Sequence, residues 1–179
     1  AIASNMTLSN KITFDPGAKL KPASGITVTL SGGYEAEDDQ QVFDLSVGGS
    51  IAIGSRGYVT PQHFGSVSTS ADVAIQHAVD VISSRGGGKI YCPAGVYSLS
   101  GTVTIGGYGI QLTGEGSGAG AFGNKGTVFN YSGSGYAIVL GDQVNDIHYD
   151  LNVSNLTITG TASGKAGIRV GGVLSDANN

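Results

Sequence analysis

The chain has 179 residues, a formal net charge of −4 and only 12% charged residues, with no basic cluster, which excludes nucleic acid as an expected partner. No apolar run approaches the roughly 18 residues that a membrane helix needs, and the single cysteine, Cys92, excludes an intrachain disulfide. The 31 glycines and 40% hydrophobic residues, in short alternating runs, predict many short strands joined by tight turns.

Residues 1–57 contain short strand candidates separated by turn chemistry such as DPG and SGG. These candidates are MTLS, KITF, AKLK, ITVTL, QVFDLS and SIAIG. The acidic segment at 35–39 has alternating carboxylates, Glu35, Glu37 and Asp39, as a calcium loop does. It lacks the glycine that bends such a loop, so we interpret it as a solvated loop.

An irregular linker is expected at 58–67, followed by one amphipathic helix near 70–85. Ser70 or Thr69 is placed to cap the helix, and Asp72 suits its positive N-terminal end. One face is apolar, with Ile75, Ala78, Val79 and Ile82 at three-four spacing. A helix with a single apolar stripe among many strands is expected to lie across the end or side of the sheets and to cover their open end.

Three glycines, Gly86–Gly88, must end that helix, and short strand candidates return after them. They are KIYC, VYSLS, TVTI, IQLTG, TVFNYS, YAIVLG, LNVSNLTITG and GIRVGG. An antiparallel sandwich gives a similar rhythm, but no Asn-Gly or Asp-Gly hairpin turn separates these candidates. We therefore predict a mainly β fold, a parallel β-helix in which each coil has about three short strands.

Several motifs between Val59 and Gly172 resemble the pectate-lyase-like superfamily of bacteriophage tailspikes and related polysaccharide-degrading proteins. They are VTPQHFGSV, ADVAIQHAVDVI, GGGKIYCPAGVYSLS, IQLTGEGSG, TVFNYSG and VSNLTITG. The segment ITFDPGAKLKPASGITVTLSG resembles stretches that precede this motif in phage tail proteins. One departure is SVSTSAD, which keeps only Asp72 of the family's acidic stretch before the helix. This departure puts in doubt a family site near that loop.

The resemblance implies a right-handed parallel β-helix with one N-terminal capping helix, beginning at 58 and preceded by a short-strand region at 1–57. It implies a virion tail protein, or else a secreted one, that forms a homotrimer and contacts other tail proteins. Its expected ligand is bacterial surface polysaccharide, which it binds and degrades by hydrolase or lyase chemistry. The alternatives are a non-catalytic structural or adhesin component of the tail and a secreted bacterial pectate-lyase-like enzyme. The chain is expected to be an N-terminal fragment that is inactive alone.

Glycoside hydrolysis needs two carboxyl groups roughly 5 to 9.5 Å apart, a separation that neighbouring coils supply. The candidates are Asp142 with Asp146, or Glu115 with Asp142; His148 and Tyr149 are neighbours suited to contact a sugar. The competing interpretation of this acidic stretch is a solvated loop between two coils.

Lyase chemistry needs a base and a cation that neutralises a uronate, and Lys165 and Arg169 are four apart, on one face of an expected strand. The competing interpretation is that Lys165 and Arg169 are charged side chains exposed to solvent on the outside of a coil. His77 is expected to be structural or exposed, and Asn152 and Asn155 to turn coil corners. The glycine-rich segment 113–126 matches no phosphate-binding loop, and no cofactor or metal site is predicted.

Overall fold

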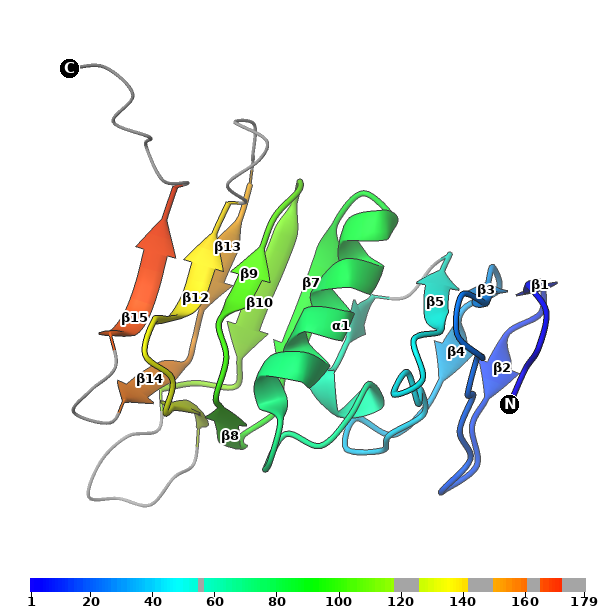
Figure 1. Ribbon diagram of the computed structural model, residues 1–179, viewed down its shortest axis with the longest axis horizontal. Coiled ribbons are helices and arrows are strands. Elements are labelled where there is room, and N and C mark those ends of the chain that lie inside the picture. Colours follow the sequence, from blue (N-terminus) through cyan, green and yellow to red (C-terminus); the bar gives the residue numbers. More distant parts are fainter. Residues whose placement is uncertain (55–56, 118–125, 142–149, 161–164, 172–179) are drawn as a thin grey trace.

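The computed structural model describes residues 1–54, 57–117, 126–141, 150–160 and 165–171. Over these residues the protein is mainly β with a single α-helix, and every described strand pair is parallel. The strands follow one another along the long axis of the molecule, from the N-terminus at one end to the C-terminus at the other (Figure 1). Parallel pairing after Lys89 is therefore confirmed, and the antiparallel alternative is wrong.

After the helix, successive strands belong in turn to three sheets, and we call each set of three successive strands a rotation. The first three strands are β7 (Gly88–Cys92), β8 (Gly95–Leu99) and β9 (Val103–Ile105). The next three pair with them in the same order: β10 (Ile110–Gly114), β11 (Thr127–Tyr131) and β12 (Tyr136–Leu140). The last three extend the same sheets: β13 (Asn152–Ser154), β14 (Thr157–Gly160) and β15 (Lys165–Val170).

Alternation along each strand explains why the sheets surround a core. In-register neighbours such as Ile90 and Leu112 are fully buried, while the residues between them reach the surface. The second sheet buries Tyr97 against Phe129, whose ring centroids lie 5.3 Å apart. Each strand of the first two rotations, β7 to β12, thus contributes buried residues to rows that continue from one rotation to the next.

The described part of residues 1–57 contains five shorter strands. A three-stranded sheet contains β1 (Met6–Leu8), β3 (Thr27–Leu30) and β5 (Ser50–Ile53), and β2 (Ile12–Thr13) pairs with β4 (Tyr34–Glu35). The strands expected at AKLK and QVFDLS reduce to one bridge between Leu20 and Phe43. Strand β4 ends at Glu35, and the rest of the segment at 35–39 lies outside the strands, which agrees with the predicted loop.

The helix α1 (Ala71–Ser84) confirms the predicted element and its buried face. Ile75 and Ile82 are fully buried and Val79 is 2% exposed, against strands on both sides of the helix. Ser70 is the N-cap residue, but its side chain accepts no capping hydrogen bond. Asp72 instead accepts the backbone N–H of Gly101 at 2.8 Å, which ties the helix to the loop before β9.

The irregular linker predicted at 58–67 is wrong in part, because half of this segment lies in a strand or a 3-10 helix and parts of it cover strand edges. Strand β6 (Tyr58–Val59) pairs with the edge of β7, and a 3-10 helix, η1 (Pro61–His63), follows. The carbonyl of Val67 accepts the N–H of Ser98 in β8 at 2.9 Å. The edges of β7 and β8 that face the helix side of the molecule's long axis thus both have backbone partners.

The partner of β9 is a side chain of α1. The Gln76 amide accepts the N–H of Thr104 at 3.0 Å and donates to its carbonyl at 3.1 Å. The Gln76 side chain therefore makes with Thr104 the two hydrogen bonds that a neighbouring strand would make. Pairing edge groups in this way removes a template for edge-to-edge association.

The three glycines after α1 turn the chain sharply into β7. All three have positive φ, from 87° at Gly86 to 145° at Gly88, which L side chains rarely adopt. A side chain at Gly87 would also strike the Tyr108 carbonyl, and one at Gly88 would take the place of the Arg85 guanidinium. The positive φ values, and the close contacts at Gly87 and Gly88, therefore favour glycine at these three successive positions.

An aromatic cluster fills the interior before the helix. Phe14, Tyr34, Phe43 and Phe64 contact one another with ring centroids 5.0 to 6.0 Å apart. His63 is fully buried beside them: its Nδ1 accepts the Thr60 N–H at 3.2 Å, so its Nε2–H donates to the Glu37 carbonyl at 3.2 Å. One core cluster runs from Phe14 to Ile138, and the domain division at 57/58 stays a prediction.

Candidate functional site: a polar sheet face between two grooves

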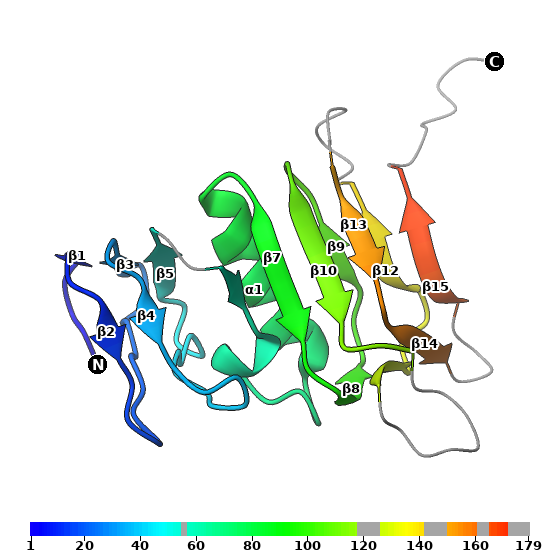
Figure 2. The same cartoon turned by 180° about the vertical axis from the view of Figure 1, so that it is seen from behind.

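The sheet β6–β7–β10–β13 presents a polar and aromatic surface, which we call the outward face. One row across it places Tyr58, Lys89, Gln111 and Asn152 in register. The next row places Tyr91, Thr113 and Ser154 side by side, with the Ser154 hydroxyl 3.2 Å from that of Thr113. These strands are on the near side of the molecule in Figure 2, where β7, β10 and β13 run in the same direction.

Two tyrosines give the outward face its aromatic character. The rings of Tyr58 and Tyr91 meet edge to face with centroids 5.4 Å apart, and both side chains are half-buried. The Lys89 ammonium lies 5.6 Å from the Tyr91 ring centroid, within the range of a cation–π contact. Neighbouring rows of hydroxyl, amide and aromatic groups are suited to the alternating polar and apolar surfaces of a sugar chain.

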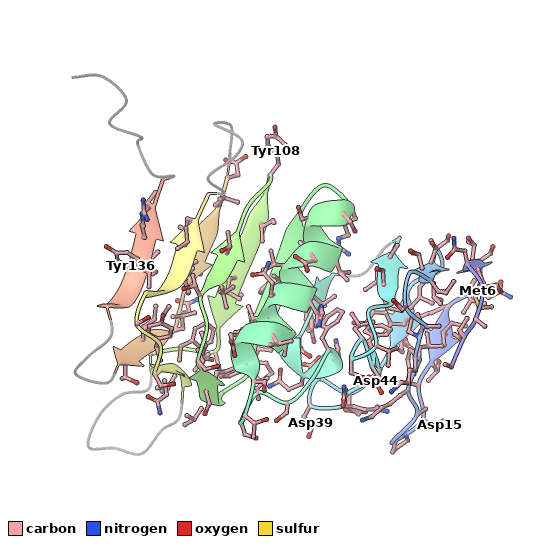
Figure 3. The ribbon with its side chains drawn as sticks, viewed as in Figure 1. Met6, Asp15, Asp39, Asp44, Tyr108 and Tyr136 are labelled. Carbon is pink, nitrogen blue, oxygen red and sulfur yellow. The ribbon has the colours of Figure 1, made fainter. Side chains whose placement is uncertain are left out.

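A groove of about 360 Å³ lies at the carboxyl ends of these strands, and we call it the acidic groove. It is lined by Ala36, Glu37, Asp38, Asp39, Tyr58 and Pro93. The Tyr58 hydroxyl donates to Asp38 Oδ2 at 3.0 Å, and the Thr60 hydroxyl donates to the Asp38 carbonyl at 2.7 Å. These hydrogen bonds tie the acidic segment to β6, the first strand of the sheet, and to the residue that follows it. Asp39 lies along one long edge of the molecule (Figure 3).

A second groove, of about 730 Å³, lies where these strands begin, and we call it the basic groove. It is lined by Lys11, Gly32, Gly33, Tyr34, Gly54, Gly57 and Arg85. The Lys11 ammonium pairs with Glu35. Burial lowers the pKa of Arg85 from its ordinary value, opposed by its interaction with Tyr34. The two grooves thus border opposite ends of the outward face with opposite charge.

Of the three carboxylates proposed from the sequence, the structure describes Glu115. It is exposed, follows β10 directly, and its N–H donates to the Thr127 hydroxyl at 2.9 Å. Because that hydroxyl also contacts the Pro93 carbonyl at 3.2 Å, Glu115 lies one strand beyond the acidic groove. Asp142, Asp146, His148 and Tyr149 lie outside the described residues, so their pairing stays a prediction.

The structure brings Arg169 close to Tyr136, its guanidinium carbon 5.9 Å from the ring centroid. The side chain of Lys165 lies outside the described part of the chain. A register shift separates the Tyr136–Lys165 pair from the Ile138–Ile168 pair, so simple alternation does not relate Lys165 to Arg169. Their predicted common face therefore stays untested.

The predicted corner role is confirmed for Asn155 and wrong for Asn152. Asn155 has φ of 56° between β13 and β14, a conformation that asparagine tolerates better than most residues. Asn152 lies inside β13 and pairs with Gln111 on the outward face. His77 is half-buried on α1 and lines a separate hollow of about 200 Å³ beside β5.

The described residues also bear on a cysteine nucleophile, a metal site and a membrane-spanning helix. Burial raises the pKa of the Cys92 thiol, which is fully buried and therefore unsuited to be a nucleophile. Within the described ranges no three His, Cys, Asp or Glu side chains are placed to hold a metal ion. No helix in the part of the chain that the structure describes is long and apolar enough to cross a membrane.

The outward face and both grooves were missed from the sequence. One available signal was the alternation in GKIYC and IQLTG, which places Lys89 and Tyr91, then Gln111 and Thr113, on one side of two paired strands. The comparisons add no name to this geometry: no family model, no curated protein and no solved structure matches the chain.

Proposed function

We propose that the protein is a tailspike-type tail component of a bacteriophage that binds host surface polysaccharide on the outward face. The observation that carries the proposal is the outward face itself, with two tyrosines and two rows of polar side chains between grooves of opposite charge. The motif order from Phe64 to Tyr97 adds the resemblance to pectate-lyase-like proteins. In this proposal the three rotating sheets are the walls of a right-handed parallel β-helix, and the protein works on the virion as a homotrimer.

A surface that is aromatic, hydroxyl-rich and, apart from Lys89, uncharged fits a glycan better than a protein partner of strong charge. Tyrosine supplies apolar ring area together with a polar hydroxyl. Serine, threonine, asparagine and glutamine supply both donors and acceptors, which suits sugar hydroxyls. The parallel strands repeat these groups along the molecule, so a repeating ligand meets a repeating surface.

The binding test is a titration of the protein against a panel of purified bacterial capsules and lipopolysaccharides. Tyr91→Ala is expected to weaken binding about three- to tenfold, because one stacking contact is lost. Tyr136→Ala is the matched control, since it removes a tyrosine from the sheet that contains β9 and β12. Binding that Tyr91→Ala leaves unchanged, or that Tyr136→Ala lowers equally, argues against the outward face as the site.

Degradation is tested separately, because the alternatives include a non-catalytic adhesin or structural component. We expect the chain alone to release no new reducing ends and no unsaturated uronate from any polysaccharide it binds. Turnover that is abolished by Asp142→Asn or Asp146→Asn would instead place the active site within this chain. A secreted bacterial enzyme, the remaining alternative, is favoured by turnover without any association with virions.

The homotrimer is proposed from the family resemblance and from the apolar N-terminal end. Met6 is 38% exposed at that end of the molecule (Figure 3), and Leu8 and Ile12 are only partly buried. Neighbouring copies are the simplest cover for these side chains. Light scattering on the protein is expected to give three chains, and a monomer overturns the trimer.

A further inference from the structure

Arg85 is the cation of the basic groove that has no carboxylate partner in the described ion pairs. It is the C-cap residue of α1, and its Nε donates to the Gly87 carbonyl at 3.0 Å. The guanidinium lies against Gly88, which has no side chain in its way. Neither ion pair of the described residues includes Arg85, although burial lowers its pKa. A half-buried guanidinium without a carboxylate gains from an anion that replaces its lost water.

The groove around Arg85 has the form of a binding site. Its volume is about 730 Å³, and four of its seven lining residues are glycines, including Gly32 and Gly57, so a ligand reaches the backbone itself. Lys11 adds a second cation, although Glu35 holds it. Arginine presents its donors in a planar fork that matches a carboxylate or a phosphate, and of these two anions we take the carboxylate as the partner of Arg85.

The basic groove opens onto the outward face. Gly57 and Gly88 line or border the groove, and the residues after them, Tyr58 and Lys89, form the first row of the face. Tyr108, which is 53% exposed, lies at the same edge one strand further, since its carbonyl borders Gly87. Figure 3 shows Tyr108 at the opposite long edge from Asp39. A glycan on the face therefore reaches Arg85 at one end only.

From this geometry we infer that Arg85 in the basic groove binds the carboxylate of an acidic sugar, and that the bound polysaccharide contains hexuronate. The inference rests on the proposed function and names its ligand class. At the far end of the five-residue strand β7, about 16 Å away, Glu37, Asp38 and Asp39 repel a carboxylate. The charge difference between the ends thus fixes the direction in which the ligand lies.

The first experiment uses small probes on the intact protein. Glucuronate, glucose and inorganic phosphate are titrated while the arginine Nε–H signals are followed by NMR. Glucuronate is expected to shift the Arg85 signal and to bind more tightly than glucose. Arg85→Gln is expected to weaken glucuronate about tenfold or more, since a charge-assisted hydrogen bond is lost. Arg85→Lys keeps the charge without the fork and is expected to fall between.

Lys19→Gln is the matched control, because it removes one cation whose ammonium donates to Gln41 at 2.6 Å, outside the lining of the basic groove. Equal binding of glucose and glucuronate overturns the inference, and so does phosphate that binds as tightly as glucuronate, which marks a general anion site. Loss of the folded state in Arg85→Gln is checked by circular dichroism. If that variant does not fold, the comparison of Arg85→Lys with wild type decides, and equal glucuronate affinity overturns the inference.

The second experiment separates this inference from the proposed function. The polysaccharides that wild type binds are compared before and after chemical reduction of their carboxylates to alcohols. Weaker binding after reduction in wild type, with no such difference in Arg85→Gln, supports the acidic-sugar site. Binding that depends on Tyr91 but not on reduction or on Arg85 overturns the inference and leaves the function in place. Absence of binding to every polysaccharide overturns both.

Discussion

The strands before α1 and those after it stack in the same direction but are held together differently. In the region before β6 the strands are two to four residues long, and in-register partners are 22 or 23 residues apart, as Met6 is from Val28 and Thr27 from Ser50. After it, described strands reach six residues, and β13 pairs with β10 across an insertion. Their outward rows are mostly uncharged.

The difference teaches where a stack of short strands finds its stability and where it can offer a binding surface. Both ion pairs of the described residues, Lys11–Glu35 and Lys21–Asp44, join successive turns of the region before the helix. These four charged side chains are therefore already paired within the protein. In the region after the helix, longer backbone ladders and buried rows hold the strands, so outward tyrosine, threonine and asparagine side chains are available to a ligand.

The largest effect is expected where the two regions meet. Ile82→Asp places a carboxylate at a fully buried position of α1 and is expected to cost more than about 4 kcal/mol, with loss of soluble protein. Soluble yield and thermal unfolding measure it. Val73→Asp is the control on the same helix, since Val73 is 52% exposed, and it is expected to change stability by less than about 0.5 kcal/mol. Equal stability of Ile82→Asp and wild type would refute the covering role of the helix.

A smaller effect is expected at the edge that α1 pairs. Gln76→Ala removes both hydrogen bonds to Thr104 and is expected to cost about 1–3 kcal/mol of unfolding free energy. The uncovered edge of β9 is also expected to raise concentration-dependent association. Denaturant unfolding and light scattering check the two effects. Gln111→Ala, at an exposed position of the outward face, is the control, and identical behaviour of the two variants would contradict the prediction.

At the corner of the later strands, Asn155→Ala is expected to cost about 1 kcal/mol, because alanine tolerates its φ of 56° less well than asparagine. Asn155→Gly is expected to be close to neutral at this position. Asn152→Ala, in the neighbouring strand, is the matched control. Thermal unfolding of the three variants tests the assignment, which fails if Asn152→Ala is the most destabilised.

The smallest effect concerns acid and the region before the helix. The hydrogen bond from Lys21, together with those from Ser46, lowers the pKa of Asp44 below its ordinary 3.8. Because the folded-state pKa is depressed, this stabilisation is present above pH 3.8 and is lost as the pH falls below it. Both side chains are partly exposed, so the loss is expected to be below about 1 kcal/mol. Asp44→Asn is expected to flatten the stability profile between pH 4 and 2; an unchanged slope would contradict this.

The sequence predicted the strands after α1 well because each has apolar residues at every second position and a glycine or proline nearby. It also predicted α1, whose apolar stripe leaves little alternative. Before the helix it failed to show the repeat, although ASNMTLS and ASGITVTLS begin and end alike. The strands there are so short that two residues, as in Tyr34–Glu35, are hard to tell from a loop.

The candidate site was less predictable, for a physical reason. The outward face joins Tyr58, Lys89, Gln111 and Asn152, whose alignment depends on register rather than on local pattern. Loop insertions change the spacing between partners, so no fixed period in the sequence identifies them. The sequence directed attention to Glu115 and to carboxylates near 142–146, while the acidic groove lies beside Tyr58 and Pro93.

The order of strand pairing has a consequence for how the protein is made. Each described strand from β10 to β15 pairs with a strand already earlier in the chain, and no described pairing waits for a distant C-terminal partner. Ribosomes add about 5–20 residues each second, so a unit of about 30 residues emerges every 2–6 s. Formation of a hairpin-sized element takes microseconds, far less than that interval. Each new turn can therefore dock on a finished surface before the next one leaves the ribosome.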